Sequence, residues 1–508
     1  MQKLSASRSG RAKLNILFSL LGQFVTLVCG IIVPRMLIAA FGSEAYGATA
    51  SIAQFLAYIA LLEGGIGGVA RAALYRPLAE NDPQKIGEIL NEIRRFFRTI
   101  AYIFAAYVLV LAIFFKPLSG TESLDWTTTF LLVIVISIST FAEYFIGISY
   151  SVLLQAAQKN YVTATINMGV KILNTIFVVV LVLAGCSLVS VKLVSSFIFA
   201  LKPLFLWFYA NKQFDLQKRP AVHTNYLKDK WAGLGQHIAY FLHSNTDIAV
   251  LTIFGNLKMV AVYSVYYMIV GQIQNVCSSF MNGMEAVFGD MLAKNETTSL
   301  SKAFDHYETL ISVFSTLLFS VAAVMILPFV KLYTAGIHDA NYREPVFAIV
   351  LVLASYIFSL RIPYHGTTIA AGHFKQTQVA AYGEAIINIT LSIALVRKYG
   401  LVGVAIGTLA ATTSRMLYYA VYLKRHIVHR RLSLFVKREL VNIGAFACIC
   451  WLGSILVKHL EILHYFHWIG VSVIMTLIAA IITGTANTLF YRDEIRALVQ
   501  KMKRGKRA

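Results

Sequence analysis

The sequence predicts an all-α integral membrane protein with about fourteen transmembrane helices. Of its 508 residues, 58% are hydrophobic and only 14% are charged, whereas a soluble domain has about 45–50% apolar and about 25% charged residues. Apolar runs of about 20 residues recur along the whole chain, and each can cross a hydrocarbon core of about 30 Å as a helix. A membrane barrel would need alternating apolar and polar residues, and these runs do not alternate.

The basic residues orient these helices in the membrane. The expected spans are residues 14–34, 45–66, 97–115, 129–152, 162–184, 186–208, 237–255, 259–287, 307–330, 345–366, 376–397, 400–422, 439–458 and 467–490. With both termini in the cytoplasm, 32 of the 45 Lys and Arg residues fall in inner segments and 8 in outer loops and their helix ends. This asymmetry follows the positive-inside rule. The net charge of +21 therefore needs no nucleic-acid partner.

A repeated segment indicates that the chain contains two copies of one six-helix unit. The sequence LAEND at Leu78–Asp82 returns as LAKNE at Leu292–Glu296, an offset of 214 residues. Asn174 and Asn388 have the same offset, and the offset pairs spans one to six with spans seven to twelve. Because each copy has an even number of spans, both copies have the same orientation, and an axis along the membrane normal should relate them.

This repeat predicts the domain organisation of a secondary transporter. The expected domains are an N-lobe at 1–210, a basic cytoplasmic linker at 211–236, a C-lobe at 237–423, an additional helix pair at 424–490 and a basic cytoplasmic tail at 491–508. Two such lobes around a cavity can alternate access to a site near the bilayer midplane. Each chain supplies both lobes, so we expect a monomer.

Ionisable residues inside the predicted spans are the main candidates for a functional site. Such groups are costly in a bilayer and usually face a cavity or a partner. They are Glu63, Glu143, Lys171, Lys192, Lys202, Asp247, Glu285, Arg361, Glu384 and Arg415. Several belong to polar stripes at helical spacing, which indicate a wetted helix face. These stripes are Thr140, Glu143, Gly147 and Tyr150; Asn167, Lys171 and Asn174; Gln236, Tyr240, His243 and Asp247; Asn275, Ser279 and Asn282; Glu384 and Asn388; and Thr408, Thr412, Arg415 and Tyr419.

A purely structural role is the alternative for each of these charges. Lys171 and Glu384 occupy adjacent positions of the two repeats and could form an ion pair. Lys192 and Lys202 lie near helix ends, where lysine side chains reach the headgroups. The five cysteines have no spacing typical of a metal site or of a disulfide framework, and we expect neither a metal nor a cofactor.

Three segments resemble a known family. FGSEAYG at Phe41–Gly47 is similar to a segment that follows the first span of polysaccharide flippases. NTDIAVLTIFG at Asn245–Gly255 resembles the start of their second lobe, and LLEGGIG at Leu61–Gly67 resembles the end of their second span. Together with the duplicated unit, these segments resemble the multidrug/oligosaccharidyl-lipid/polysaccharide exporter superfamily, and within it the O-antigen or capsule repeat-unit (Wzx-type) flippases.

The resemblance implies a function. Such proteins move an undecaprenyl-pyrophosphate-linked oligosaccharide across the bacterial plasma (inner) membrane for surface polysaccharide assembly. Beyond this substrate, the implied partners are membrane lipids and polysaccharide assembly enzymes. A diphosphate needs a polar, partly cationic cavity in place of water. The expected substrate-binding residues are Lys171, Arg361, Arg415, Asn174, Asn275 and Arg35, and the expected residues for coupling to H⁺ or Na⁺ are Asp247, Glu384 and Glu143.

Three other functions remain open at this point. A multidrug or cation antiporter of the same superfamily typically has twelve spans and an acid-lined site. A lipid II flippase shares the fourteen-span plan, but its first-span arginine–aspartate cluster is missing around Arg35. A membrane glycosyltransferase or polymerase would need a large loop with catalytic acids or histidines, and no loop has a paired-carboxylate, metal or phosphate-loop pattern. We therefore expect a transporter and not an enzyme.

Overall fold

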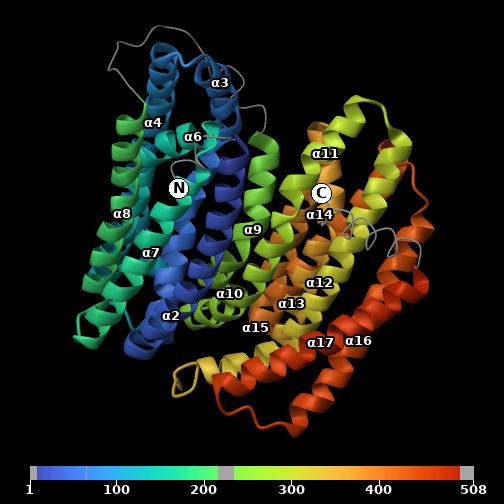
Figure 1. Cartoon of the computed structure of the whole chain (residues 1–508). Coiled ribbons are helices and arrows are strands. Elements are labelled where there is room, and N and C mark those ends of the chain that lie inside the picture. The colour runs from blue at the N-terminus through green and yellow to red at the C-terminus, as the bar shows by residue number, and fades with distance from the viewer. Residues whose placement is uncertain (1–7, 65, 215–233, 492–508) are drawn as a thin grey trace. The chain divides into compact units, whose positions relative to one another are not determined.

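The computed structural model describes residues 8–64, 66–214 and 234–491, and within these ranges every regular element is a helix (Figure 1). The chain divides into two compact units. Unit 1 is Met1–Phe241 with Asn256–Ala261, and unit 2 is Leu242–Gly255 with Val262–Ala508. Most of the predicted linker and nearly all of the predicted tail lie outside the described residues.

Unit 1 is built from paired long helices. Its helices are α2 (Arg8–Ala57), η1 (Tyr58–Glu63), α3 (Ile66–Glu80), α4 (Pro83–Ser119), α5 (Trp126–Ala142), η2 (Glu143–Gly147), α6 (Ile148–Ala156), α7 (Asn160–Leu183) and α8 (Leu188–Gln213). The main packing partners are α2 with α7, α5 with α8, and α7 with α8. η2 is a π-helical turn between α5 and α6.

The remaining helices belong to unit 2, except for residues up to Phe241 and Asn256–Ala261, which belong to unit 1. They are α9 (Leu234–Phe254), α10 (Leu257–Ser279), α11 (Met281–Ala293), α12 (Thr297–Tyr333), α13 (Pro345–Leu360), α14 (Ile362–Ala370), α15 (Phe374–His426), α16 (Leu432–His459) and α17 (Tyr465–Phe490). Within unit 2, α13 packs along α15, and α12 packs against α13, α16 and α17.

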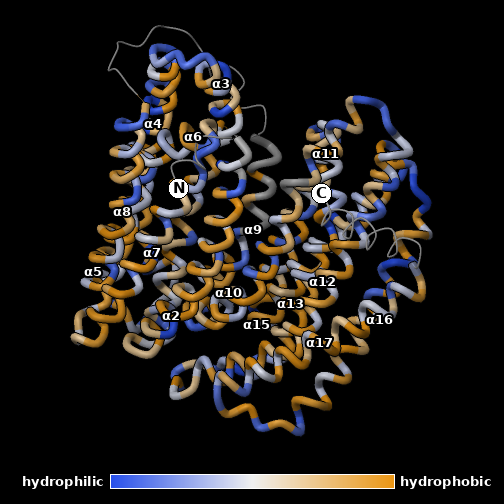
Figure 2. Tube along the Cα trace, viewed as in Figure 1, coloured by the Kyte–Doolittle hydropathy of each residue, from blue (hydrophilic) through white to orange (hydrophobic). Residues whose placement is uncertain are grey.

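The lengths of these helices agree with the predicted membrane spans. Ten helical segments among the described residues are long and apolar enough to cross a membrane, and hydrophobic residues predominate along them in Figure 2. Two of the ten, with 51 and 53 residues, would each be more than about 75 Å long if straight. Both contain a glycine with non-helical backbone angles, Gly42 and Gly400, so each makes two crossings. With α9 and α10, the described chain contains about fourteen crossings, which confirms the predicted fold class.

The 214-residue repeat reappears in the helix boundaries. α4 and α12 both have 37 residues, and both of their ends differ by 214. α6 and α14 both have 9 residues and show the same offset. The left-handed residues also recur, because Gln158 has φ 59° and Gly372 has φ 69°. The sequence repeat therefore corresponds to a repeat of the backbone structure.

The duplicated LAEND and LAKNE segments form the turn before α4 and α12. Asn81 has φ 50° and Asn295 has φ 56°, a left-handed conformation that asparagine tolerates better than most residues. Asp82 then caps α4, because its side chain accepts a hydrogen bond of 3.0 Å from the backbone N–H of Lys85. Pro83 occupies the first turn of α4, where no N–H donor is needed.

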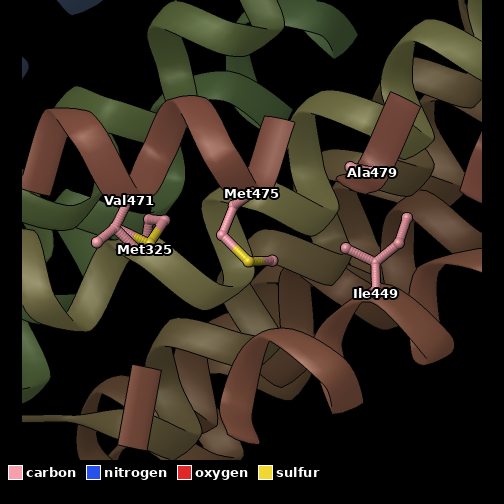
Figure 3. Close-up of a cluster of buried hydrophobic side chains, with 5 residues drawn as sticks. All are labelled: Met325, Ile449, Val471, Met475 and Ala479. Atoms are coloured by element: carbon pink, nitrogen blue, oxygen red, sulfur yellow. The ribbon is translucent and has the colours of Figure 1, made fainter. Parts of the chain in front are cut away.

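The last two helices of unit 2 pack on α12 through an apolar cluster. Figure 3 shows Met325 of α12 with Ile449 of α16 and with Val471, Met475 and Ala479 of α17. These five side chains are buried, and the indole N–H of Trp468 donates a 3.0 Å hydrogen bond to the carbonyl oxygen of Met325. The additional helix pair is therefore anchored to the six-helix part of unit 2.

Candidate functional site

A buried carboxylate in unit 2 is surrounded by neutral hydrogen-bond donors. Asp247 of α9 is 7% exposed. It accepts hydrogen bonds of 2.8 Å from the Tyr263 hydroxyl of α10, 2.8 Å from the Thr408 hydroxyl of α15 and 3.2 Å from the side-chain N–H of Asn388, also of α15. The described ion pairs give Asp247 no basic partner. An ionised carboxylate buried in this way is costly without a compensating charge.

We call Asp247, Tyr263, Asn388, Ser392 and Thr408 the Asp247 cluster. The Ser392 hydroxyl donates to Oδ1 of Asn388 at 2.9 Å. The Thr408 hydroxyl also lies 3.2 Å from the carbonyl oxygen of Val404. The cluster thus brings together carboxylate, amide, hydroxyl and main-chain oxygens, which are the ligands that hard cations prefer.

The bend in α15 is what brings these oxygens together. Gly400 has φ 55° and ψ −128°, so the two halves of α15 fold back on each other. A Cβ on Gly403 would lie 2.6 Å from the backbone of Leu395, and a Cβ on Gly407 would lie 2.9 Å from the backbone nitrogen of Ser392. Glycine at both positions lets the half-helices approach closely enough for their side chains to share Asp247.

The predicted charges Arg361, Glu384 and Arg415 form one buried group in unit 2. Both arginines form ion pairs with Glu384, one to each carboxylate oxygen. The exposed fraction is 3% for Arg361, 1% for Glu384 and 2% for Arg415. Arg415 also donates a 2.9 Å hydrogen bond to the Tyr419 hydroxyl. This arginine–glutamate triad has a formal net charge of +1, since two guanidinium groups share one carboxylate.

In unit 1 the predicted residues form single hydrogen bonds or a single salt bridge. Lys171 donates a 2.7 Å hydrogen bond from Nζ to the Thr26 hydroxyl, and Asn174 accepts one of 2.6 Å from Ser195. Glu143 forms a 2.8 Å salt bridge with Lys202. The π-helical turn and Gly147 accommodate this carboxylate, because a Cβ at Gly147 would lie 2.6 Å from Oε2 of Glu143. π-helical turns occur frequently at functional sites.

The structure brings some of the predicted residues together and leaves others apart. Glu384 has two arginine partners in its own unit, and Lys171 has Thr26 in its own unit. Arg35 is half-buried in α2, directly after Pro34, and Asn275 is exposed on α10. The assignment of all nine residues to substrate or ion stays a prediction.

One charged network in unit 2 was not predicted from the sequence. Glu308 of α12 is 1% exposed and accepts hydrogen bonds from Arg430, Arg438 and the Tyr364 hydroxyl. Arg430 also lies 3.0 Å from Asp305. The partners of Glu308 come from two segments far from it in the chain, around Tyr364 and at Arg430–Arg438, so no helical spacing could show them. Glu308 itself, an acid inside the span 307–330, was the available signal.

The comparisons with known proteins identify the fold. No family model matches the chain, and no curated protein matches it by sequence. The chain shares its fold with solved structures of a lipid II flippase and of MATE transporters, one of which is described as a member of the MOP superfamily. The structure described as "Lipid II flippase MurJ, inward closed conformation" has a TM-score of 0.68 and 16% identity, over 94% of this chain and 100% of that chain.

Two multidrug transporters match over a smaller share of this chain. An inward-facing MATE family transporter of the same superfamily has a TM-score of 0.57 and 13% identity, over 79% of this chain and 95% of that chain. The MATE multidrug transporter DinF-BH, solved in a ligand complex, has a TM-score of 0.59 and 17% identity, over 84% of this chain and 98% of that chain. The chain is a multi-pass membrane protein with a transporter fold.

Proposed function

We propose that the chain is a flippase that moves an undecaprenyl-pyrophosphate-linked oligosaccharide across the bacterial plasma membrane by alternating access, for surface polysaccharide assembly. The observation that carries the proposal is the arginine–glutamate triad, which holds a net positive charge within the membrane-spanning part of a fourteen-helix flippase-like fold. A cationic drug would be repelled by such a group, whereas a diphosphate would be attracted to it.

The triad could bind a diphosphate by exchange of partners. An arginine presents a planar fork that matches phosphate oxygens as well as carboxylate oxygens. A diphosphate that reaches the triad can take one guanidinium from Glu384, while the other arginine still neutralises the carboxylate. Lys171 is a second candidate, because its described partner is a hydroxyl and not an acid.

The Asp247 cluster is our proposed coupling site for a sodium ion or a proton. Asn388 of the cluster lies four residues after Glu384 of the triad on the first half of α15, and Arg415 lies seven residues after Thr408 on the second half. Both sites are therefore built on the same two half-helices. An ion bound at Asp247 would change how these halves pack and thus alter the triad, which is the physical basis for coupling.

A lipid II flippase is the second candidate function. The observation in its favour is that the matched MurJ structure is covered over its whole length, together with 94% of this chain. Both candidate substrates carry a prenyl diphosphate, so the triad does not distinguish them. They differ in the attached sugars, and only a transport assay with both lipids separates them.

The test is lipid flipping in reconstituted vesicles with short-chain prenyl diphosphates that carry either a surface-polysaccharide sugar or the lipid II headgroup. Wild type should move one of these lipids, and Arg415→Gln and Lys171→Ala should each reduce the rate by about tenfold or more, as expected for loss of a charged hydrogen bond. Lys375→Gln, which removes an exposed base, is the control and should be unchanged. If wild type moves neither lipid but exports organic cations down an ion gradient, the proposal is wrong.

The coupling site has its own test. Sodium should raise the thermal stability of the wild-type protein in detergent, and Asp247→Asn should abolish this effect. Asp290→Asn removes an exposed acid that is paired with Lys294, and it should keep the full effect. If sodium has no effect but a proton gradient drives flipping in wild type and not in Asp247→Asn, the coupling ion is the proton. Equal gradient dependence in both proteins would exclude Asp247.

A further inference from the structure

A basic pocket lies in unit 2 where α15 turns into α16. The residues that matter for its chemistry are Phe304, Tyr364, Lys424, Arg430, Arg431 and Phe435. The pocket is thus lined by three cationic side chains and by aromatic rings, a combination that suits an anion with an apolar part.

Arg430, which is one of the residues that line this pocket, has unsatisfied donors. Its side chain is 8% exposed, and its Nη1 forms the ion pairs with Asp305 and Glu308. Its Nε and Nη2 are buried without a hydrogen-bond partner among the described atoms. A buried donor left unpaired is costly. Nε and Nη2 form one edge of the guanidinium fork, which is the geometry that binds two oxygens of a phosphate.

Further positive charge surrounds the same pocket. Lys424 and Arg431 are exposed, and the described ion pairs include neither of them. α16 begins at Leu432, and it has no side-chain cap and no acidic residue in its first turn. Its first N–H groups and its dipole therefore favour an anion at this end. Asp305 and Glu308 form ion pairs with Arg430 and Arg438, and the nearby Glu439 interacts with the same two arginines, so the positive charge available to an anion is that of Lys424 and Arg431.

The position of the pocket indicates the source of the anion. α15 and α16 each contain a segment long and apolar enough to cross a membrane, so their turn lies at a membrane surface. The positive-inside rule predicts the inner surface for this turn, where anionic lipids attract basic residues. Phe304 and Phe435 add an apolar wall to the pocket. We propose that this basic pocket binds the phosphate-bearing headgroup of an anionic phospholipid of the inner leaflet, separately from the transported lipid.

The test is native mass spectrometry of the full-length protein in detergent, with dioctanoyl phosphatidylglycerol, dioctanoyl phosphatidylcholine and inorganic phosphate as probes. Phosphatidylglycerol should bind best. Lys424→Gln/Arg431→Gln should weaken its binding by about tenfold or more, as expected for loss of charge-assisted hydrogen bonds. Arg430→Lys, which keeps the charge beside Glu308 but loses the fork, should weaken binding by a similar factor. The matched control is Arg425→Gln/Lys375→Gln, which removes two exposed bases outside the pocket and should bind as wild type does.

Each other outcome overturns the proposal. Equal loss in the two double variants would mean that general surface charge binds the lipid. Equal binding of phosphatidylcholine would show that the anionic headgroup is not recognised, and inorganic phosphate that competes at equal concentration would identify a soluble anion. Arg415→Gln separates this site from the transport site, because it removes a triad arginine and should leave phosphatidylglycerol binding intact. Loss of binding in Arg415→Gln would contradict a separate pocket.

Discussion

Glu384 is the shared ion-pair partner of two buried arginines, so its replacement by glutamine should destabilise unit 2 strongly. Arg361 and Arg415 are both nearly inaccessible to solvent, and both pair with this carboxylate. Removal of one partner from a buried ion pair costs about 3–5 kcal/mol, because an uncompensated charge remains. The glutamine oxygen can still accept one hydrogen bond, so we expect a loss of about 3–5 kcal/mol and not twice that amount.

Arg415→Gln is the informative comparison, because it leaves a balanced pair of Arg361 and Glu384. It removes hydrogen bonds to Glu384 and Tyr419 but leaves no unpaired charge, so we expect a cost of about 1–3 kcal/mol. In the double variant Glu384→Gln/Arg415→Gln, only Arg361 lacks a counter-charge. The double variant should therefore lose less than the sum of the single losses, by about 0.5–3 kcal/mol.

The free energy of unfolding can be measured by SDS titration in mixed micelles, followed through the fluorescence of the five tryptophans. The expected order of stability is wild type, then Arg415→Gln, then Glu384→Gln. The reasoning would be refuted if Glu384→Gln were as stable as Arg415→Gln, or if the two losses were simply additive. Either result would mean that the three charges do not act as one buried group.

Three further predictions concern the backbone, pH and topology. Gly403→Ala should cost about 1–3 kcal/mol, because its Cβ would lie 2.6 Å from the backbone of Leu395, whereas Gly444→Ala has open space and should be neutral or slightly stabilising in the same titration. Hydrogen bonds from the Thr128 hydroxyl and backbone N–H hold the pKa of Asp125 below its usual value, so the cap stabilises α5 at neutral pH and this contribution is lost as the pH falls through the lowered pKa. The stability difference between wild type and Asp125→Ala should therefore shrink on acidification, and a constant difference would argue against the cap. The predicted topology places the C-terminus in the cytoplasm and His338 in an outer loop. A fluorescent protein fused to the C-terminus should therefore fluoresce, and alkaline phosphatase inserted after His338 should be active, whereas the opposite pattern would reverse this topology.

Sequence patterns predicted the fold because a membrane leaves few choices to the backbone. An apolar run of sufficient length must become a helix, and a repeated sequence predicted a repeated set of helix boundaries. The Asn81 and Asn295 turns show the reason at the level of single residues, since the same local chemistry starts a 37-residue helix twice. Helical spacing likewise predicted that Glu384 and Asn388 share one face of α15.

The partners of the buried charges could not be predicted in this way. Spacing shows which residues share a helix face, but it does not show which helix that face meets. Glu384 has Arg361 and Arg415 as partners only because α15 bends at Gly400 and α13 packs along it. Glu308 and its arginines are separated by 122 and 130 residues, so no local pattern connects them. The tertiary packing decides these contacts.

The two repeats share a backbone plan but differ in charge. Arg94 and Glu308 are 214 residues apart, and so are Tyr150 and Tyr364. In unit 1 Arg94 donates to the Tyr150 hydroxyl, whereas in unit 2 the Tyr364 hydroxyl donates to Glu308. The same tyrosine thus joins the same pair of helices in both units, but the charge on its partner is opposite. The acid Glu308 lets unit 2 hold both Arg430, which lines the basic pocket, and Arg438. The counterpart of Asp247 in unit 1 is position 33, which is a valine. The buried acids Asp247, Glu308 and Glu384 all belong to unit 2. The proposed ion coupling and lipid-headgroup binding would therefore both depend on this unit. A repeated backbone does not require the two lobes to be equivalent in transport.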